Sequence, residues 1–151
     1  GGAGRVFVAG HSAGGYLTSM IGLDKRWLEP YGIDPDTAFV ALIPYSGQVV
    51  THFERRRELG LPDTQPLVDD MAPLSYVRPD CRPMLILSGD REREMLGRYE
   101  ENAYFWRMMR VAGHPDVRIC EFDGFDHGNM PQAGHFVAVR YIREMERRMD
   151  R

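Results

Sequence analysis

A glycine-rich pentapeptide between an apolar run and an amphipathic run constrains this chain more than any other feature. The pentapeptide Gly10–Gly14 reads Gly-His-Ser-Ala-Gly and matches the pattern G-x-S-x-G. An apolar run, Arg5–Ala9, precedes it, and the following residues place apolar side chains on one helical face, namely Ala13, Leu17, Met20 and Ile21. A serine on a strained strand-to-helix turn projects its hydroxyl from the edge of a sheet. The pattern therefore predicts Ser12 as a nucleophile.

The other residue types in the pentapeptide fit the same chemistry. Gly10 and Gly14 have no Cβ, which lets strand and helix approach closely. The backbone N–H of Ala13 can donate to an oxyanion, and the N-terminus of the following helix adds a favourable dipole. We expect His11 to pack or hydrogen-bond beneath the turn, outside the reacting side. The alternative interpretation is a glycine-rich turn with an inactive serine.

Strands and helices alternate along the rest of the chain. Apolar runs predict four strands, at Arg5–Ala9, Phe39–Tyr45, Met84–Leu87 and Val117–Glu121. Helical spacing recurs in two later stripes, which comprise Phe105, Met108, Met109 and Ala112, and then Ala138, Tyr141, Ile142, Met145 and Met149. Gly113 is placed to end the first of these helices. The pattern predicts an α/β fold with a parallel sheet flanked by helices.

One segment breaks this alternation. Residues 46–83 form a long connection that is rich in proline and charge. We treat residues 1–151 as one domain and predict that residues 46–83 pass over the carboxyl edge of the sheet as a lid or substrate wall. A plain surface loop with one short helix is the alternative.

Composition excludes several classes of protein. The chain has 151 residues, 43% of them hydrophobic and 27% charged, which is ordinary for one soluble domain. A net charge of −3 gives no electrostatic basis for binding nucleic acid, and no apolar run approaches the ~20 residues of a membrane span. Cys81 and Cys120 match no zinc spacing, so we predict buried free thiols, with a disulfide as the alternative, and no metal site. The compartment stays open.

A serine hydroxyl needs a general base, and the histidines supply the candidates. His127 follows the fourth predicted strand in the loop Gly124–Asn129, which places it at the same sheet edge as Ser12. We therefore predict His127 as the base. The remaining histidines outside the pentapeptide, His52, His114 and His135, are expected to be ordinary surface residues.

The acid that orients such a histidine is expected after the third strand. The sequence there runs Leu87–Glu94 and offers three carboxylates, Asp90, Glu92 and Glu94. The residues alone identify this loop without choosing among the three.

Three segments carry a resemblance to a known family. Val8–Leu17, Ser88–Glu92 and Asp126–Gly128 resemble the esterase/lipase branch of the α/β-hydrolase superfamily, and more narrowly its hormone-sensitive-lipase-like and acetyl xylan or feruloyl esterase-like groups. The resemblance covers the chain almost end to end but corresponds to the second half of a family member. In that family the acid usually lies three residues after the glycine that closes the strand. The resemblance thus implies Glu92, with Asp90 as the alternative.

The resemblance also implies an activity. It implies a serine hydrolase that cleaves carboxylic esters through an acyl-enzyme, without a cofactor, on a small-molecule or saccharide ester with a short acyl or aromatic group. Arylformamidases share the same pentapeptide, so an amide-cleaving relative is one alternative. A non-catalytic α/β-hydrolase-like binding scaffold is another, and a peptidase of the superfamily fits less well.

Two features of the family have no counterpart in this sequence. The chain starts at Gly1 without an initiator methionine and contains neither the His-Gly-Gly oxyanion loop nor the early strands of the family. We therefore expect a piece of a longer gene product in which Arg5–Ala9 is an unpaired sheet edge. On this basis the 151 residues alone are expected to be poorly soluble or inactive.

Overall fold

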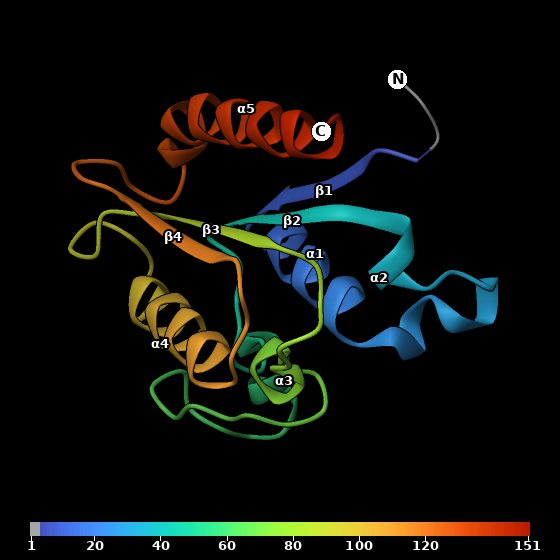
Figure 1. Ribbon diagram of the computed structural model, residues 1–151. Helices are drawn as coiled ribbons and strands as arrows, with labels where there is room; N and C mark the ends of the chain where they lie inside the picture. The colour runs from blue at the N-terminus through green and yellow to red at the C-terminus, as the bar shows by residue number, and fades with distance from the viewer. Residues whose placement is uncertain (1–3) are drawn as a thin grey trace.

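The computed structural model describes residues 4–151 and places a parallel four-stranded sheet at the centre (Figure 1). The strand order is β1-β2-β3-β4, and every neighbouring pair is parallel. The strands are β1 (Val6–His11), β2 (Phe39–Tyr45), β3 (Met84–Gly89) and β4 (Val117–Phe122). The predicted α/β class and all four predicted strands are confirmed.

Helices cover both faces of this sheet. The helices α1 (Ala13–Leu23) and α4 (Arg98–Val111) lie on one face, and α5 (Met130–Met149) lies on the other (Figure 1). Gly113, just beyond α4, has a φ of 89°, as a glycine that ends a helix does. The shorter elements are α2 (Pro35–Ala38), α3 (Phe53–Glu58) and three 3₁₀ turns at Lys25–Trp27, Glu29–Tyr31 and Pro73–Tyr76.

The two central strands are apolar on both sides because each side faces a different helix. Ile43 and Leu87 pack in the cluster that contains Tyr141 of α5. The alternating residues Leu42 and Ile86 pack in the cluster that also contains α4 residues, Phe105 and Met109. Strands buried on both faces read as continuous apolar runs, which explains why these strands were visible in the sequence.

The buried face of α1 differs from the predicted one. Leu17, which the apolar pattern assigned to the core, is 56% exposed. The buried residues are mostly small, namely Gly15, Thr18, Ser19, Met20, Gly22 and Leu23. A Cβ added to Gly15 would lie 2.8 Å from the carbonyl oxygen of Tyr45 at the end of β2. The short distance between helix and sheet therefore selects for small side chains rather than for the most apolar ones.

The long segment 46–83 contains α3 and the 3₁₀ turn at Pro73–Tyr76, and it lies on the sheet face that carries α1 and α4 (Figure 1). The hydroxyl of Tyr16 in α1 donates to the carbonyl of Met71, and the N–H of Leu74 donates to the carbonyl of Val49. The segment is thus tied both to α1 and to itself. Its role as a lid stays a prediction.

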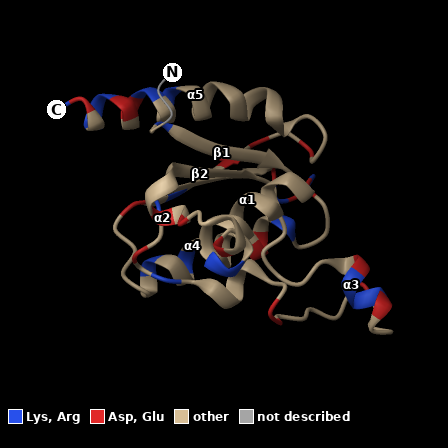
Figure 2. Ribbon diagram, turned by 90° about the vertical axis from the view of Figure 1, so that its right-hand side faces the viewer, with Lys and Arg blue, Asp and Glu red and all other residues tan. Residues whose placement is uncertain are grey.

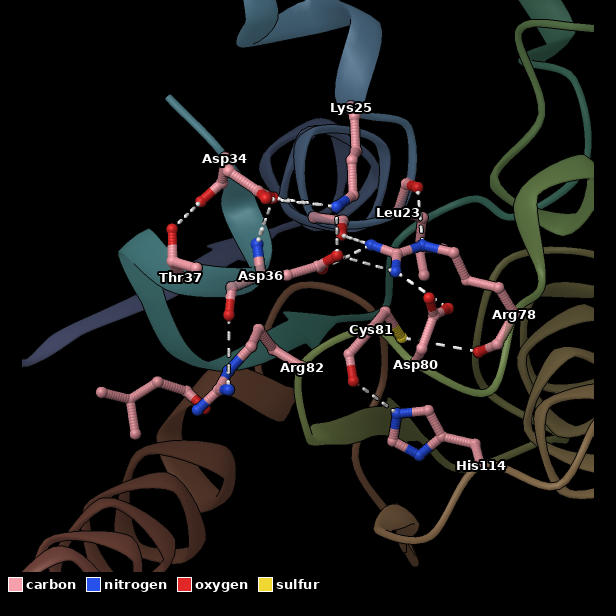
Figure 3. A network of polar contacts seen from close by, with 12 residues as sticks. Leu23, Lys25, Asp34, Asp36, Thr37, Arg78, Asp80, Cys81, Arg82 and His114 are labelled. Atoms are coloured by element: carbon pink, nitrogen blue, oxygen red, sulfur yellow. Dashed lines mark hydrogen bonds and ion pairs between the residues drawn. The ribbon is translucent and has the colours of Figure 1, made fainter. Parts of the chain in front are cut away.

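A polar network anchors the end of this segment just before β3 (Figure 3). Arg78 pairs with Asp36 of α2 and donates from Nε to the carbonyl of Leu23 at the end of α1. Lys25 also reaches Asp36, at 2.6 Å. The half-buried Arg78–Asp36 pair therefore holds the chain before β3 against α2, and the bond to Leu23 holds it against α1.

Within residues 4–151 the sheet has two edge strands, β1 and β4, each paired on one side only. Strand β1 is hydrogen-bonded to β2 alone, as the sequence suggested, and Val6 at its start is 41% exposed. No helix in this range is long and apolar enough to cross a membrane. The expected poor solubility of the isolated chain stays a prediction.

The contact between α1 and the end of β2 gives a first testable prediction. Gly15→Ala should destabilise the protein by about 1–3 kcal/mol, because the new methyl group would press on backbone atoms that cannot rotate away. Gly14→Ala is the matched control, since no atom lies within 4 Å of a Cβ there. We expect the control to be neutral or to gain up to about 1 kcal/mol from better helix propensity. Urea unfolding of both variants measures the difference, and equal stabilities would contradict the proposed contact.

Candidate active site

The carboxyl edge of the sheet brings together polar side chains from four successive connections. Ser12 follows β1 directly and Ser46 follows β2 directly. Glu94 lies in the loop after β3, and His127 lies in the loop after β4. Parallel strands end at the same edge, so residues far apart in sequence meet there.

Ser12 occupies a strained turn between β1 and α1. Its backbone has a φ of 58° and a ψ of −115°, a combination that non-glycine residues adopt at a cost of about 1–3 kcal/mol. The N–H of Ser12 donates to the carbonyl of Tyr45 at 2.9 Å, which holds the turn against β2. A Cβ at Gly10 would lie 2.4 Å from the carbonyl oxygen of Gly14, so the turn requires glycine at position 10. Gly14 contributes only its backbone to this contact, because no atom lies within 4 Å of a Cβ placed on it.

The imidazole of His127 links a hydroxyl to a carboxylate. Its Nε2 lies 2.9 Å from Ser12 Oγ, and its Nδ1 lies 2.6 Å from Glu94 Oε1. The structure thus places the predicted pair Ser12 and His127 within hydrogen-bond distance.

The carboxylate beside His127 belongs to Glu94, which corrects the choice of Glu92. The N–H groups of Arg93 and Glu94 both bond to the carbonyl of Asp90, so the loop makes a helix-like turn immediately after β3. This turn leaves Glu92 exposed and directs the fully buried side chain of Glu94 back toward the sheet. The family spacing of three residues after Gly89 does not hold here, because the turn adds two residues before a carboxyl side chain points toward His127.

Asp90, the alternative acid, joins two loops instead of contacting His127. Its carboxylate accepts hydrogen bonds from the N–H groups of Gly124 and Glu92, at 2.7 and 2.8 Å. Its own N–H donates to the carbonyl of Phe125 at 2.8 Å. These bonds fasten the loop that contains Glu94 to the loop that contains His127.

The surroundings of Glu94 keep it ionised. Burial alone would raise the pKa of Glu94, but hydrogen bonds from His127, from Ser46 and from the N–H of Met95 outweigh burial and lower the pKa to about 2. An ionised carboxylate only accepts hydrogen bonds, so the proton on the His127 ring must be on Nδ1. Nε2 is then free to accept a proton from Ser12.

Ser46 is a member of this cluster that the sequence did not reveal. Its Oγ donates to Glu94 Oε2 at 2.7 Å and lies 3.1 Å from His127 Nδ1. Ser46 is fully buried and has a φ of 44°, which puts it with Ser12 as the two non-glycine residues of positive φ in the range 4–151. The one local signal was its position directly after a strand of the same sheet, and that position by itself does not distinguish it from any other loop serine.

His11 supports the cluster from below. Its Nε2 lies 2.8 Å from the carbonyl oxygen of His127, and the two rings are 4.7 Å apart at their centroids. Burial lowers the pKa of His11 and outweighs the hydrogen bond to the carbonyl of His127, which raises it. The hydrogen bond beneath the turn that the sequence suggested is thus present.

Ala13 is placed as the sequence predicted. It is the first residue of α1, so its N–H has no acceptor inside the helix. A positive helix N-terminus therefore lies directly beside the hydroxyl of Ser12.

The other histidines lie outside this cluster. His52 accepts from the N–H of Glu54 at the start of α3, and His135 of α5 contacts the hydroxyl of Tyr45. His114 corrects the expectation of a surface residue, because it is 6% exposed and lies 3.1 Å from the carbonyl oxygen of Cys81 (Figure 3). No three His, Cys, Asp or Glu side chains in the described part of the chain form a group that could hold a metal.

Comparison of the fold with solved structures identifies similar proteins. An esterase from Thermogutta terrifontis, esterase 2 phosphoramylated by tabun, superposes with a TM-score of 0.67 at 21% identity, over 92% of this chain and 54% of that one. The propionate-bound structure of the Thermogutta esterase gives the same TM-score and identity, over 92% and 55% of the two chains. An acylaminoacyl peptidase from Pyrococcus horikoshii superposes with a TM-score of 0.60 at 19% identity, over 84% and 20%.

These similarities establish the fold. The chain has the α/β-hydrolase fold from the strand before Ser12 onward, as the sequence predicted. It spans about half the length of the esterase structures and a fifth of the peptidase structure. No protein-family model matches the sequence. The search of curated proteins also found no match.

The low pKa of Glu94 predicts how stability depends on pH. A carboxyl whose pKa falls from 4.5 unfolded to about 2 folded stabilises the protein above pH 4.5, and this stabilisation is lost as the pH falls from 4.5 toward 2. The difference in unfolding free energy between wild type and Glu94→Gln should therefore shrink over that window. Urea unfolding at several pH values measures it, with Glu92→Gln as the control for loss of one negative charge. A difference that stays constant from pH 6 to pH 2 would refute the assignment.

Proposed function

We propose that this chain is the nucleophile-bearing part of a serine hydrolase that cleaves carboxylic esters through an acyl-enzyme. The observation that carries the proposal is the hydrogen-bonded series from Ser12 Oγ through His127 to the ionised carboxylate of Glu94. A nucleophile, a base and an orienting acid in this order are the working parts of serine hydrolases on several unrelated folds. The serine lies on the strained turn that such enzymes of the α/β class use.

In the first half of the proposed reaction, Ser12 Oγ attacks the carbonyl carbon of the ester while its proton passes to His127 Nε2. Glu94 holds the Nδ1–H of His127 and stabilises the imidazolium that forms. The N–H of Ala13 donates to the oxyanion of the tetrahedral intermediate. The intermediate collapses when His127 returns the proton to the leaving alcohol, which departs and leaves the acyl group on Ser12.

In the second half, water attacks the acyl carbon and gives its proton to His127. The new intermediate collapses, the carboxylic acid leaves, and the proton returns to Ser12. The net reaction consumes one ester and one water and yields one acid and one alcohol. The same groups would serve an amide or formamide substrate, with His127 protonating a leaving amine.

Short acyl groups are the substrates that we favour. The Thermogutta esterase has been solved with propionate and with butyrate bound. Its overlap covers 92% of this chain. An aromatic acyl group or a saccharide ester, which the sequence resemblance suggested, belongs to the same proposal.

Covalent labelling of the serine tests the proposal directly. A fluorophosphonate probe should form one adduct, on Ser12, because a hydroxyl with a hydrogen-bonded base attacks phosphorus as it attacks an acyl carbon. The Thermogutta esterase is likewise modified by organophosphorus agents. Peptide mass spectrometry locates the adduct, and Ser12→Ala is the control. A folded protein without an adduct on Ser12 would favour the non-catalytic scaffold instead.

The identity of the acid gives a separate prediction. Glu94→Gln should slow labelling of Ser12 by roughly 10³–10⁴-fold, because a carboxamide cannot hold the required tautomer or stabilise the imidazolium. Glu92→Gln removes an exposed carboxyl from the same turn and should label at the wild-type rate. Pseudo-first-order labelling rates of the two variants decide between them. The reverse order, with Glu92→Gln slow, would restore the acid suggested by the sequence.

A further inference from the structure

A cavity of about 190 Å³ lies between α3, the start of α4 and the chain after β2. Its lining residues do not include Ser12, Glu94 or His127, so it is separate from the reaction centre. It nevertheless adjoins that centre in sequence, because Gln48 lies two residues beyond Ser46 and Met95 follows Glu94. The cavity has room for about six water molecules.

Arg56 of α3 lines this cavity and is buried without a counter-ion. It is 8% exposed, and its Nη1 donates to the carbonyls of Asp63 and Gln65. Its Nε is buried and has no hydrogen-bond partner, and the described residues place no carboxylate within ion-pair distance of the guanidinium. A buried charge without an opposite charge is costly, so this guanidinium would gain from binding an anion.

The neighbours of Arg56 on the same helix differ from it. Arg55 pairs with Glu58, and Arg57 pairs with Glu54 and with Asp63. The charges of both signs along α3 are visible in Figure 2. Arg56 alone in this run turns inward and meets only backbone carbonyls.

Two further donors line the same cavity. Gln48 is 4% exposed, and its carboxamide can donate two hydrogen bonds. Arg98 is equally buried, and one of its terminal nitrogens, Nη2, lies 3.9 Å from the sulfur of Met95, a weak acceptor. Its other nitrogens are used, since Nε pairs with Glu101 at 3.0 Å and Nη1 donates to the carbonyl of Ser46. Side chains with donor groups, from three separate elements, thus line one cavity.

The charges of the lining indicate the charge that a ligand should carry. Arg57 pairs with Asp63 and Arg98 with Glu101, whose pKa is raised by burial to about 7. Above that pH the lining keeps the single positive charge of Arg56. A singly charged carboxylate balances this charge, whereas a phosphate dianion would bring an excess. Carboxylates also match the planar donors of a guanidinium in two parallel hydrogen bonds.

The remaining wall of the cavity is apolar. It includes Phe53 of α3 and the exposed side chains of Met95 and Leu96. We propose that this cavity binds a small monocarboxylate with an apolar body, its carboxylate held by Arg56, Gln48 and Arg98. The proposal is independent of the hydrolysis proposed above, because it requires binding alone.

Calorimetric titration with benzoate tests the site. Benzoate should bind the chain, and benzamide, which has the same shape without the charge, should bind at least about tenfold more weakly. Gln48→Glu should also weaken benzoate by about tenfold or more, because its new carboxylate would occupy Arg56 from within. Arg56→Gln should act in the same direction, and Arg55→Gln, an exposed change of the same type on the same helix, should bind as the wild type does.

Thermal unfolding shows which variants are folded. Gln48→Glu keeps the test decisive if Arg56→Gln does not fold, since glutamate has nearly the same size and shape as glutamine. Absence of benzoate binding to the wild type would overturn the proposal. Equal binding to wild type and Gln48→Glu would also overturn it, because benzoate would then occupy another place, such as the reaction centre. Loss of Ser12 labelling together with intact benzoate binding would reject the proposed hydrolase and leave this site standing.

Discussion

The close approach of two backbones positions everything else at the carboxyl edge of the sheet. Gly15 of α1 and Gly47 after β2 lie so near each other that a Cβ on either would press on the other's backbone. This contact sets the height of α1 over β2. It also sets where Ser12 leaves β1 and where Ser46 leaves β2. Because each of these serines donates its N–H to the neighbouring strand, the two turns are fixed in register with the sheet.

Each polar group in the resulting cluster has one role. The carboxylate of Glu94 receives hydrogen bonds from four groups, namely His127 Nδ1, Ser46 Oγ and the N–H groups of Met95 and Gly89. Together they lower the pKa of Glu94 in spite of its burial. Asp90 does not touch His127, yet it fastens together the two loops on which Glu94 and His127 depend. Loops that carry reacting groups need such bonds, since a misplacement of about 1 Å can cost roughly 100-fold in rate. The carboxylate that the sequence offered as an alternative acid therefore has a structural role of its own.

How far the sequence predicts this molecule depends on the kind of interaction involved. Four strands and the turn at Ser12 follow from short-range patterns. The central strands β2 and β3 are buried on both faces and continuously apolar, and the turn requires Gly10. His127 follows from topology. Glu94 and Ser46 do not, because the backbone turn at Asp90 and the positive φ of Ser46 are settled by contacts between distant segments. The buried face of α1 was also missed, since close packing there favours small residues over apolar ones.

Ser12 and Ser46 both have a positive φ, which glycine adopts at a lower energetic cost. Selection for thermodynamic stability alone would tend to replace both serines with glycine. Under the proposed function, each residue marks a position where folding and chemistry make opposing demands, as is common at sites that give up stability for activity. A descendant of this chain that lost that function would no longer need serine at either position. Both positions could then change before the surrounding core does.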